Sequence, residues 1–175
     1  MEFTKLIEER RSIRAYTDEK PGKAQIEELL KAVQLAPTWK NSQTGRYYII
    51  VSDEMLGKVR DALPAFNQNS SKGAALVVTT FVKNTSGFTQ GNPDNELGNM
   101  WGAYDLGLQN AYLCLKAKDM GLDTLIMGLR DANKLREVLS VPEEEQITAV
   151  IALGYRNQEA VFKPRKELDE IAKVF

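Results

Sequence analysis

The sequence predicts a single domain of the α+β class. Three continuous β-rich runs, at residues 47–51, 75–82 and 147–153, are typical of buried strands. Helical patterns lie before, between and after these runs, without the regular alternation of strand and helix that characterises a doubly wound parallel sheet. A chain of 175 residues suffices for one domain with a sizeable core and is short for two. We therefore expect residues 1–175 to fold as one unit.

Apolar residues at helical spacing define the elements around the first two strands. A short helix is expected from about residue 3 to residue 10, and a second from the turn at 20–22 to just before Pro37. A third begins with Asp53 as its N-cap and ends at Pro64. The apolar positions that predict them are Phe3, Leu6 and Ile7; Ile26, Leu29, Leu30 and Val33; and Leu56, Val59 and Leu63.

The second half of the chain holds the longest loop and the longest helix. Residues 84–99 are rich in Gly, Asn, Ser and Thr and predict a polar loop of a length that is often functional, in which Phe88 is either a substrate-facing aromatic or a local anchor. Residues 100–120 are apolar most of the way round, which predicts a central, largely buried helix closed by Gly121. One expected face of this helix consists of Trp101, Tyr104, Leu108, Ala111 and Leu115. Later elements are a short apolar piece at 125–127, a helix from Asp131, and a basic tail with a helical pattern at Leu168 and Ile171.

The composition excludes several classes of function. A net charge of −1 disfavours a nucleic-acid binder, and no apolar run approaches the roughly 20 residues that span a bilayer. With no signal-peptide pattern at the N-terminus, a cytoplasmic protein is expected. The chain has no histidine, and its lone Cys114 lies among apolar residues at helical spacing. Histidine-dependent nucleophiles and metal sites are therefore excluded, no metal is expected, and an enzyme built from this chain would depend on a cofactor.

The segment Glu9–Tyr16 concentrates arginine. In an extended backbone Arg10, Ser12 and Arg14 point to one side, which would make a one-sided grip on an anion such as phosphate. The alternative is a solvated basic patch at a helix C-terminus, where the helix dipole favours cations. For Arg14 alone, pairing with a nearby acid is a further alternative. These residues by themselves leave the alternatives open.

Two further segments combine polar and charged groups. Residues 163–166, with sequence KPRK, form a second basic group near the C-terminus, which is either an anion contact or a solvated tail. After Pro37, the segment 38–43 offers hydroxyl and amide groups around Trp39, a set that suits a planar heterocycle with several polar edges. Taken alone, such a segment is more often an ordinary polar connection between helix and strand. No glycine-rich phosphate loop is present, so any phosphate would be held by side chains.

Four motifs in this order resemble the FMN-dependent nitroreductase family over nearly the whole chain. They are R-x-S-x-[RK] at 10–14, P-[ST]-x-x-N-x-Q at 37–43, G-L-[GD]-[ST] at 121–124 and K-x-R at 163–165. The resemblance implies an α+β homodimer with a central, mostly antiparallel sheet packed by helices. It also implies two FMN molecules at the subunit interface, each touched by both chains, and a tail at 155–175 that reaches over the dimer.

The same resemblance implies roles for particular residues. Four side chains would hold the FMN phosphate, with Arg11 at its edge: Arg10, Ser12, Lys163 and Arg165. Arg14 would lie near the pyrimidine end of the flavin and stabilise its reduced form, and Asn67 would hydrogen-bond the ring. Leu125, Ile126, Met127 and Gly128 would lie against the flavin, with a backbone N–H near Met127 or Gly128 facing its N5. The partner chain would contribute Thr38, Trp39 and Asn41.

The implied activity is the reduction of a small organic acceptor, nitroaromatic or quinone-like, with NADH or NADPH as the reductant. The mechanism would be ping-pong hydride transfer, with the chemistry on N5 of the flavin. A reductase of the same fold with another acceptor, such as an enone or a halogenated phenol, and a non-catalytic FMN-binding protein remain alternatives. The sequence departs from the family at Thr44-Gly45, where Pro-Trp is usual, and at Met127, where glutamate is frequent. These departures affect the expected substrate pocket.

Overall fold

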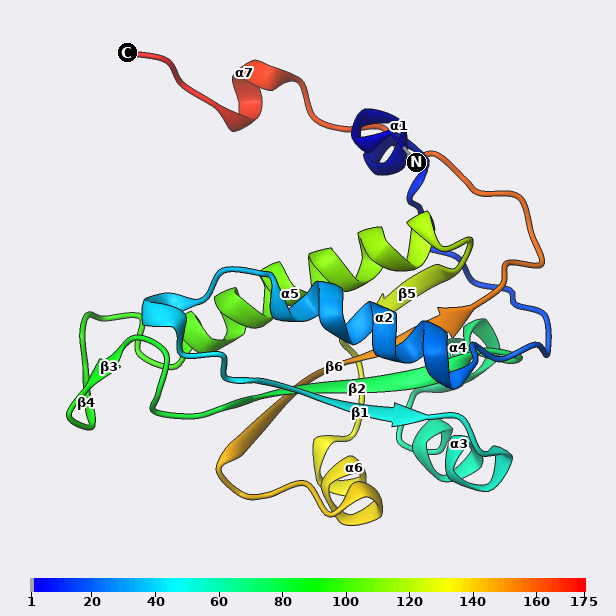
Figure 1. The fold of residues 1–175 in the computed structure, drawn as a ribbon, viewed down its shortest axis with the longest axis horizontal. Helices are drawn as coiled ribbons and strands as arrows, with labels where there is room; N and C mark the ends of the chain where they lie inside the picture. The colour runs from blue at the N-terminus through cyan, green and yellow to red at the C-terminus, as the bar shows by residue number, and fades with distance from the viewer. Residues whose placement is uncertain (1) are drawn as a thin grey trace.

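A four-stranded antiparallel sheet forms the centre of the computed structural model, which describes residues 2–175. Its order is β1-β2-β6-β5, and every neighbouring pair is antiparallel (Figure 1). The strands are β1 (Gly45–Ile50), β2 (Ala75–Val82), β5 (Asp123–Met127) and β6 (Glu145–Gly154). The predicted α+β class and antiparallel sheet are thus confirmed, and the short apolar piece at 125–127 belongs to a full strand.

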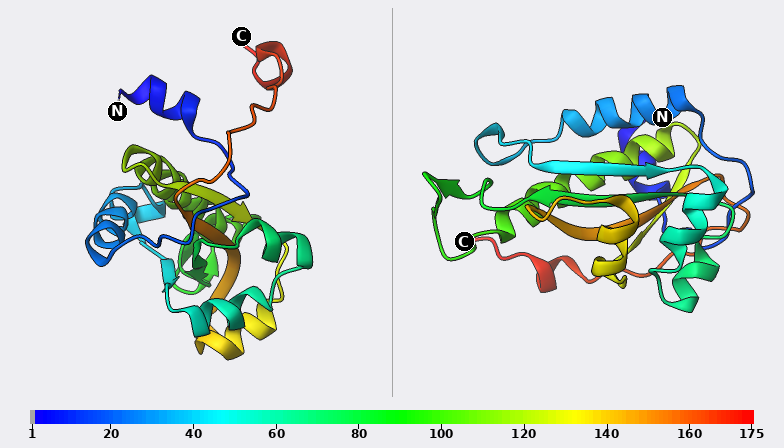
Figure 2. Two further views of the ribbon diagram at one scale, coloured as in Figure 1. Left: turned by 90° about the vertical axis from the view of Figure 1, so that its right-hand side faces the viewer. Right: turned by 90° about the horizontal axis from the view of Figure 1, so that it is seen from below.

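Helices cover both faces of this sheet, which explains why β2 and β6 are continuous apolar runs. On one face lie α2 (Lys23–Gln34) and α5 (Met100–Asp119), and on the other α3 (Asp53–Arg60), α4 (Ala65–Ser70) and α6 (Ala132–Leu139) (Figures 1 and 2). Successive strand residues point to opposite faces. Accordingly Val77 and Ile151 pack with α2 and α5, whereas Leu76 and Val150 pack with α3 and α6.

The long helix α5 is half buried rather than buried all round, which corrects the expectation for residues 100–120. Its core face is built largely from small and polar residues, including Gly102, Asp105 and Gln109. Two members of the expected apolar face, Tyr104 and Ala111, are exposed in the single chain, Tyr104 at 60%. We call this surface the α5 apolar stripe; its members are Met100, Tyr104, Leu108, Tyr112 and Leu115.

Caps and loops differ from the sequence prediction in detail. Ser52, not Asp53, is the N-cap of α3, whereas Asp131 caps α6 by accepting a hydrogen bond from the Lys134 amide at 3.0 Å. Gly121 follows α5 with a φ of +79°, as its predicted closing role requires. The predicted polar loop 84–99 contains a small hairpin of β3 (Phe88–Thr89) and β4 (Asn92–Pro93). Helix α4, the 3₁₀ turn η1 (Trp39–Asn41) and this hairpin were not predicted.

Both ends of the chain project from the body of the molecule. Helix α1 (Phe3–Glu9) and the C-terminal tail (residues 155–175), with its one-turn helix α7 (Leu168–Ile171), extend beyond the sheet and its helices (Figure 2). Every residue from 161 to 175 is exposed. Within residues 2–175 no helix is long and apolar enough to cross a bilayer.

Candidate cofactor-binding site

The arginine segment (residues 10–14) leaves α1 in an extended conformation and runs beside the first residues of β5. Ser12 forms a parallel bridge with Thr124, and the Ile13 amide donates to the Thr124 carbonyl at 3.1 Å. The Ile13 side chain is completely buried, whereas Ser12 and Arg14 on either side of it are exposed. The alternation predicted from the sequence therefore holds at these positions, because one apolar side chain anchors the segment.

The start of the C-terminal tail runs antiparallel to the same region. Tyr16 pairs with Arg156, and the Asn157 amide donates to the Ala15 carbonyl at 2.9 Å. Further along, the Arg11 guanidinium lies 5.1 Å from the centroid of the Phe162 ring, a cation–π distance. Phe162 directly precedes the KPRK group, so the tail meets the arginine segment immediately before these cations.

The cationic side chains at this crossing retain free donors. Within residues 2–175, Arg10, Lys163 and Arg165 form no side-chain hydrogen bond or ion pair, and Arg14 donates only to the Ser12 carbonyl at 3.4 Å. The alternative that Arg14 pairs with an acid therefore finds no support in the described part of the chain. The structure brings the tail to Arg11 but shows no direct contact between Lys163 or Arg165 and Ser12.

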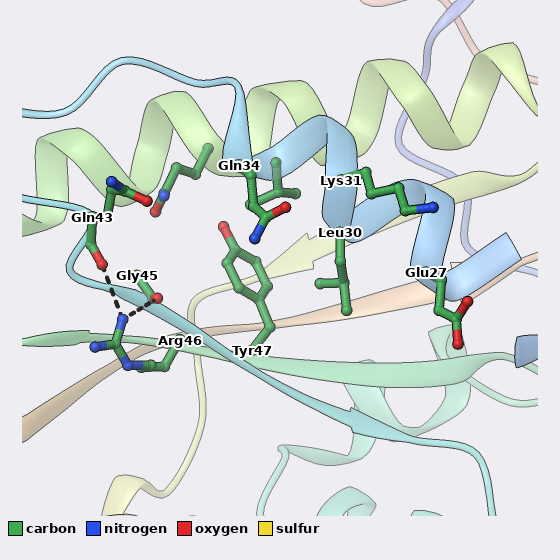
Figure 3. A pocket seen from close by; sticks show the side chains of 10 residues that line it. Glu27, Leu30, Lys31, Gln34, Gln43, Gly45, Arg46 and Tyr47 are labelled. Atoms are coloured by element: carbon green, nitrogen blue, oxygen red, sulfur yellow. Dashed lines mark hydrogen bonds between the residues drawn. The ribbon is translucent and has the colours of Figure 1, made fainter. Parts of the chain in front are cut away.

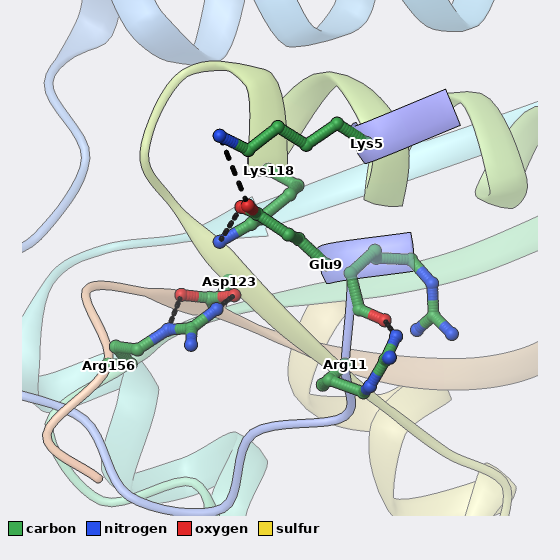
Figure 4. A network of polar contacts seen from close by, with 7 residues as sticks. Lys5, Glu9, Arg11, Lys118, Asp123 and Arg156 are labelled. Carbon is green, nitrogen blue, oxygen red and sulfur yellow. Dashed lines mark hydrogen bonds and ion pairs between the residues drawn. The ribbon is translucent and has the colours of Figure 1, made fainter. Parts of the chain in front are cut away.

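A buried ion pair, which sequence reasoning missed, joins β5 to the start of the tail. Arg156 donates to both oxygens of Asp123, at 2.6 and 2.7 Å, and the Asp123 side chain is only 3% exposed (Figure 4). Hydrogen bonding to this carboxylate raises the pKa of Arg156 above its ordinary value. Nearby, Glu9 of α1 lies 3.8 Å from the Lys118 ammonium of α5 (Figure 4). These contacts join β5 to the tail and α1 to α5 near the arginine segment.

At the other end of β5 lie Asn67 and residues 126–128. Asn67 is 7% exposed, and its amide donates to the Leu129 carbonyl at 3.2 Å, which fixes α4 against the end of β5. Ile126 is 52% exposed, while Met127 is 2% exposed and packs in the core. The Met127 side chain therefore points away from the surface that Ile126 presents. Met127, which stands where the resemblance leads us to expect glutamate, therefore lies in the core of the isolated chain.

The Thr38–Asn41 group lies far from the arginine segment of the same chain. The Trp39 amide donates to Asp105 of α5 at 2.9 Å, whereas α1 meets α5 at Lys118. These two positions are 13 residues apart, which is roughly 20 Å along the helix axis. A single chain thus does not bring the two predicted halves of the site together.

The backbone around Trp39 is unusual. Lys40, Asn41 and Gln43 have φ angles of 48°, 56° and 48°, in the left-handed region that non-glycine residues seldom adopt. Each such residue costs on the order of 1 kcal/mol unless its surroundings fix it. Here Thr38 accepts hydrogen bonds from the Asn41 and Gln43 amides, at its carbonyl and hydroxyl respectively.

A cavity of about 510 Å³ lies between α2 and β1, and Gln43 of the predicted polar segment 38–43 lines it (Figure 3). Arg46 at its edge donates to the Gln43 and Gly45 carbonyls at 2.9 and 2.8 Å (Figure 3). Glu27 and Lys31 bring opposite charges to its lining. Within residues 2–175 no group of three or more His, Cys, Asp or Glu side chains could hold a metal ion.

Several known proteins resemble this chain over most of its length. A protein of Archaeoglobus fulgidus, provisionally named NADH dehydrogenase/NAD(P)H nitroreductase, is 30% identical over 165 residues, which are 92% of this chain and 89% of that protein. The FMN reductase [NAD(P)H] of Bacillus subtilis is 26% identical over 181 residues, covering 94% of this chain and 70% of that protein.

Solved structures and a family model agree with these relatives. A provisionally identified NAD(P)H:FMN oxidoreductase from Staphylococcus epidermidis has a TM-score of 0.87 at 19% identity, over 99% of this chain and 96% of that chain. A provisionally named nitroreductase from Exiguobacterium sibiricum, solved in complex with FMN, has a TM-score of 0.83 at 20% identity, over 100% and 98%. These two likenesses show the fold. The family model described as "Nitroreductase family" matches residues 7–155, and this chain belongs to that family.

Proposed function

We propose that this protein is an FMN-dependent oxidoreductase that uses NAD(P)H to reduce a small organic acceptor in the cytoplasm. The observation that carries the proposal is the crossing of the arginine segment by the basic tail, where Phe162 meets Arg11. Two extended segments far apart in sequence there present guanidinium, ammonium and hydroxyl donors, which suit a phosphate dianion. The relatives named as NAD(P)H nitroreductase and FMN reductase support the same conclusion.

The donor set fits the phosphate and ring of FMN. The phosphate would be held by Arg10, Ser12, Lys163 and Arg165, with Arg11 at its edge. Arg14 would lie at the pyrimidine end, and Asn67 would hydrogen-bond the ring. The exposed side chain of Ile126 and the backbone of residues 127–128 would lie along one edge of the flavin. Arg10, Lys163 and Arg165 fit this role because their donors have no partner within residues 2–175.

A homodimer is part of this proposal. Trp39 and the arginine segment lie roughly 20 Å apart along α5 in one chain. A second copy could bring its Thr38, Trp39 and Asn41 to the flavin. The α5 apolar stripe and the exposed tail supply apolar surface that a second chain would bury, and the tail at 155–175 would reach over the dimer. Each of the two sites would then be built from both chains.

The catalytic contribution of the chain would be positioning and charge. When bound, FMN supplies hydride transfer at N5, so no side chain needs to act as nucleophile or base. The guanidinium of Arg14 would stabilise negative charge on the reduced ring, and the backbone of residues 127–128 would orient its edge. NAD(P)H and acceptor would use the same space in turn, which gives ping-pong kinetics. We propose a nitroaromatic or quinone-like acceptor.

The first experiment is an absorbance spectrum of the purified protein before and after anaerobic addition of NADH or NADPH. We expect a yellow protein whose flavin bands survive gel filtration and bleach with the reductant. A panel of nitroaromatic, quinone, enone and halogenated phenol acceptors then ranks the substrates. A colourless protein that takes up no added FMN contradicts the proposal. Bound FMN that neither nucleotide reduces identifies a non-catalytic flavin-binding protein instead.

The second experiment tests the phosphate site. Replacing Arg10 and Arg165 together by alanine removes two charged hydrogen-bond donors, each worth roughly 1.5–3 kcal/mol. The dissociation constant for FMN should rise on the order of 100-fold or more. The matched control replaces Lys23 and Lys58, two exposed lysines that pair with acids on their own helices, and should leave FMN affinity unchanged. Equal affinities for the two double variants mean that the phosphate lies elsewhere.

A further inference from the structure

One buried carboxylate, Asp105 of α5, holds two loops at once. The residue is 3% exposed, and its Oδ2 accepts hydrogen bonds from the Trp39 amide at 2.9 Å and from the Ser86 hydroxyl at 2.6 Å. Trp39 belongs to the strained turn after α2, and Ser86 to the loop 84–99. The two segments are more than forty residues apart in sequence, and both are attached to the same oxygen atom of one helix.

Asp105 anchors the centre of the strained turn to the rest of the molecule. The hydrogen bonds of the Asn41, Ser42 and Gln43 amides all end within residues 38–43. They shape the turn but do not attach it to another element. The bond from the Trp39 amide to Asp105 does attach it, immediately before the first residue with a left-handed backbone. A turn with three such residues persists only where its surroundings fix it.

The loop 84–99 packs on the same side of α5 and touches the turn directly. Gly87 has a φ of +76°, and a Cβ there would lie 2.5 Å from Cδ1 of Trp101. The Trp101 indole donates to Asn95 at 2.9 Å. Lys40 of the turn donates to Thr89 at 2.9 Å and to Asp94 at 3.2 Å in the hairpin. These contacts join the turn and the loop to each other, and Asp105 of α5 binds both of them.

We propose that Asp105 is a positioning residue that fixes the Trp39 turn and the loop 84–99 as one unit against α5, and so presents Thr38, Trp39 and Asn41 to the flavin of the partner chain. The presentation of these residues to the flavin rests on the proposed function, whereas the fixing of the turn and the loop rests on the contacts alone. A carboxylate suits the task because both neighbours donate, and a deeply buried oxygen without a hydrogen of its own can accept from both.

The two tryptophans of the chain provide a readout that needs no cofactor. Trp39 and Trp101 are the only tryptophans, and their ring centroids are 4.5 Å apart at an interplanar angle of 49°. Their near-ultraviolet circular dichroism depends on this mutual orientation. Asp105→Asn keeps the shape of the side chain but directs an amide donor or a weaker acceptor at the Trp39 amide and the Ser86 hydroxyl.

The matched control is Glu145→Gln. Glu145 is also a buried carboxylate, 7% exposed, and it accepts from two hydroxyls, those of Tyr48 at 3.0 Å and Thr80, but it touches neither loop. We expect Asp105→Asn to lose the tryptophan-pair signal and to weaken FMN binding on the order of tenfold. Glu145→Gln should retain both. A folded Asp105→Asn protein with the wild-type tryptophan spectrum overturns the proposal.

Amide hydrogen exchange in the unaltered protein tests the same anchor should Asp105→Asn not fold. The Trp39 amide should exchange on the order of 100-fold more slowly than the backbone amide of exposed Lys40, because that backbone amide has no hydrogen-bond acceptor within residues 2–175. Equal exchange rates overturn the proposal. Failure of the wild-type protein to bind FMN contradicts the proposed function, whereas the tryptophan spectrum and the exchange rates still decide whether Asp105 holds the turn.

Discussion

The centre of the sheet and the two ends of the chain use similar apolar residues in opposite ways. In β2 every residue from Ala75 to Phe81 is buried, and β6 is covered on both faces by helices. In the tail every residue from 161 to 175 is exposed, although it includes several large apolar side chains: Val161, Phe162, Leu168, Ile171, Val174 and Phe175. The single chain buries the apolar side chains of its sheet but leaves those of its C-terminal tail in solvent, where a second copy in the proposed dimer could cover them.

The largest effect on stability is expected at the sheet centre. Ile151 is fully buried, and Ile151→Ala should lower the free energy of unfolding by about 4 kcal/mol through lost burial and the resulting cavity. Ile126 is its cross-strand partner on β5 but is 52% exposed, which makes Ile126→Ala the matched control at less than about 1 kcal/mol. Urea unfolding without FMN measures both. Equal losses would show that Ile126 is buried in solution.

A smaller effect is expected where the sheet meets the tail. Asp123→Ala leaves Arg156 without its partner and should cost about 3 kcal/mol, the low end of the range for broken buried pairs, because the Arg156 side chain is still 29% exposed. Glu54→Ala, which removes the exposed pair with Lys58 on α3, should cause no measurable loss. Thermal unfolding of the two variants distinguishes the pairs. No difference between them would mean that the tail is not fixed by Asp123.

The smallest effect on the fold of one chain is expected in the tail itself. Leu168→Ser with Ile171→Ser should change the stability of the single chain by less than about 0.5 kcal/mol, because both side chains are exposed. If the proposed dimer forms, the same double variant should raise its dissociation constant. Sedimentation velocity over a dilution series measures this against a Lys166→Ser control in the same tail. Indistinguishable dissociation constants would remove the tail from the proposed interface.

How far the sequence predicts the fold depends on whether a pattern is local. The strands at 75–82 and 147–153 were predicted because burial on both faces makes them continuous apolar runs, and the structure confirms both. The expectation that α5 is buried most of the way round was wrong. Its core side contains Asp105 and Asn110, whose partners, Trp39 and Tyr47, lie more than sixty residues away in sequence. No local pattern reveals that a buried polar residue has a distant partner.

At the candidate site, too, features with a local sequence pattern were predicted and residues with distant partners were not. Alternation predicted that Ser12 and Arg14 point to the same side, and both are exposed while Ile13 between them is buried. The match of residues 7–155 confirms the family that four motifs predicted. The roles of Lys163 and Arg165 came from the resemblance alone and stay predictions. Asp105 and the Asp123–Arg156 pair carried no sequence signal, because an isolated acid in a helix or at a strand end resembles any solvated charge.

The strand order has a consequence for how the chain folds during its synthesis. β6 is the last strand in sequence, yet it lies between β2 and β5 and pairs with both. Until Gly154 has left the ribosome, β5 has no neighbouring strand in the sheet and β2 pairs only with β1. The apolar faces of α2, α3 and α5 therefore cannot yet pack on a complete sheet. Pairing β2 with β6 also closes a loop of about 65 residues, a contact that slows folding. Folding during synthesis should therefore end in one late step, the insertion of β6.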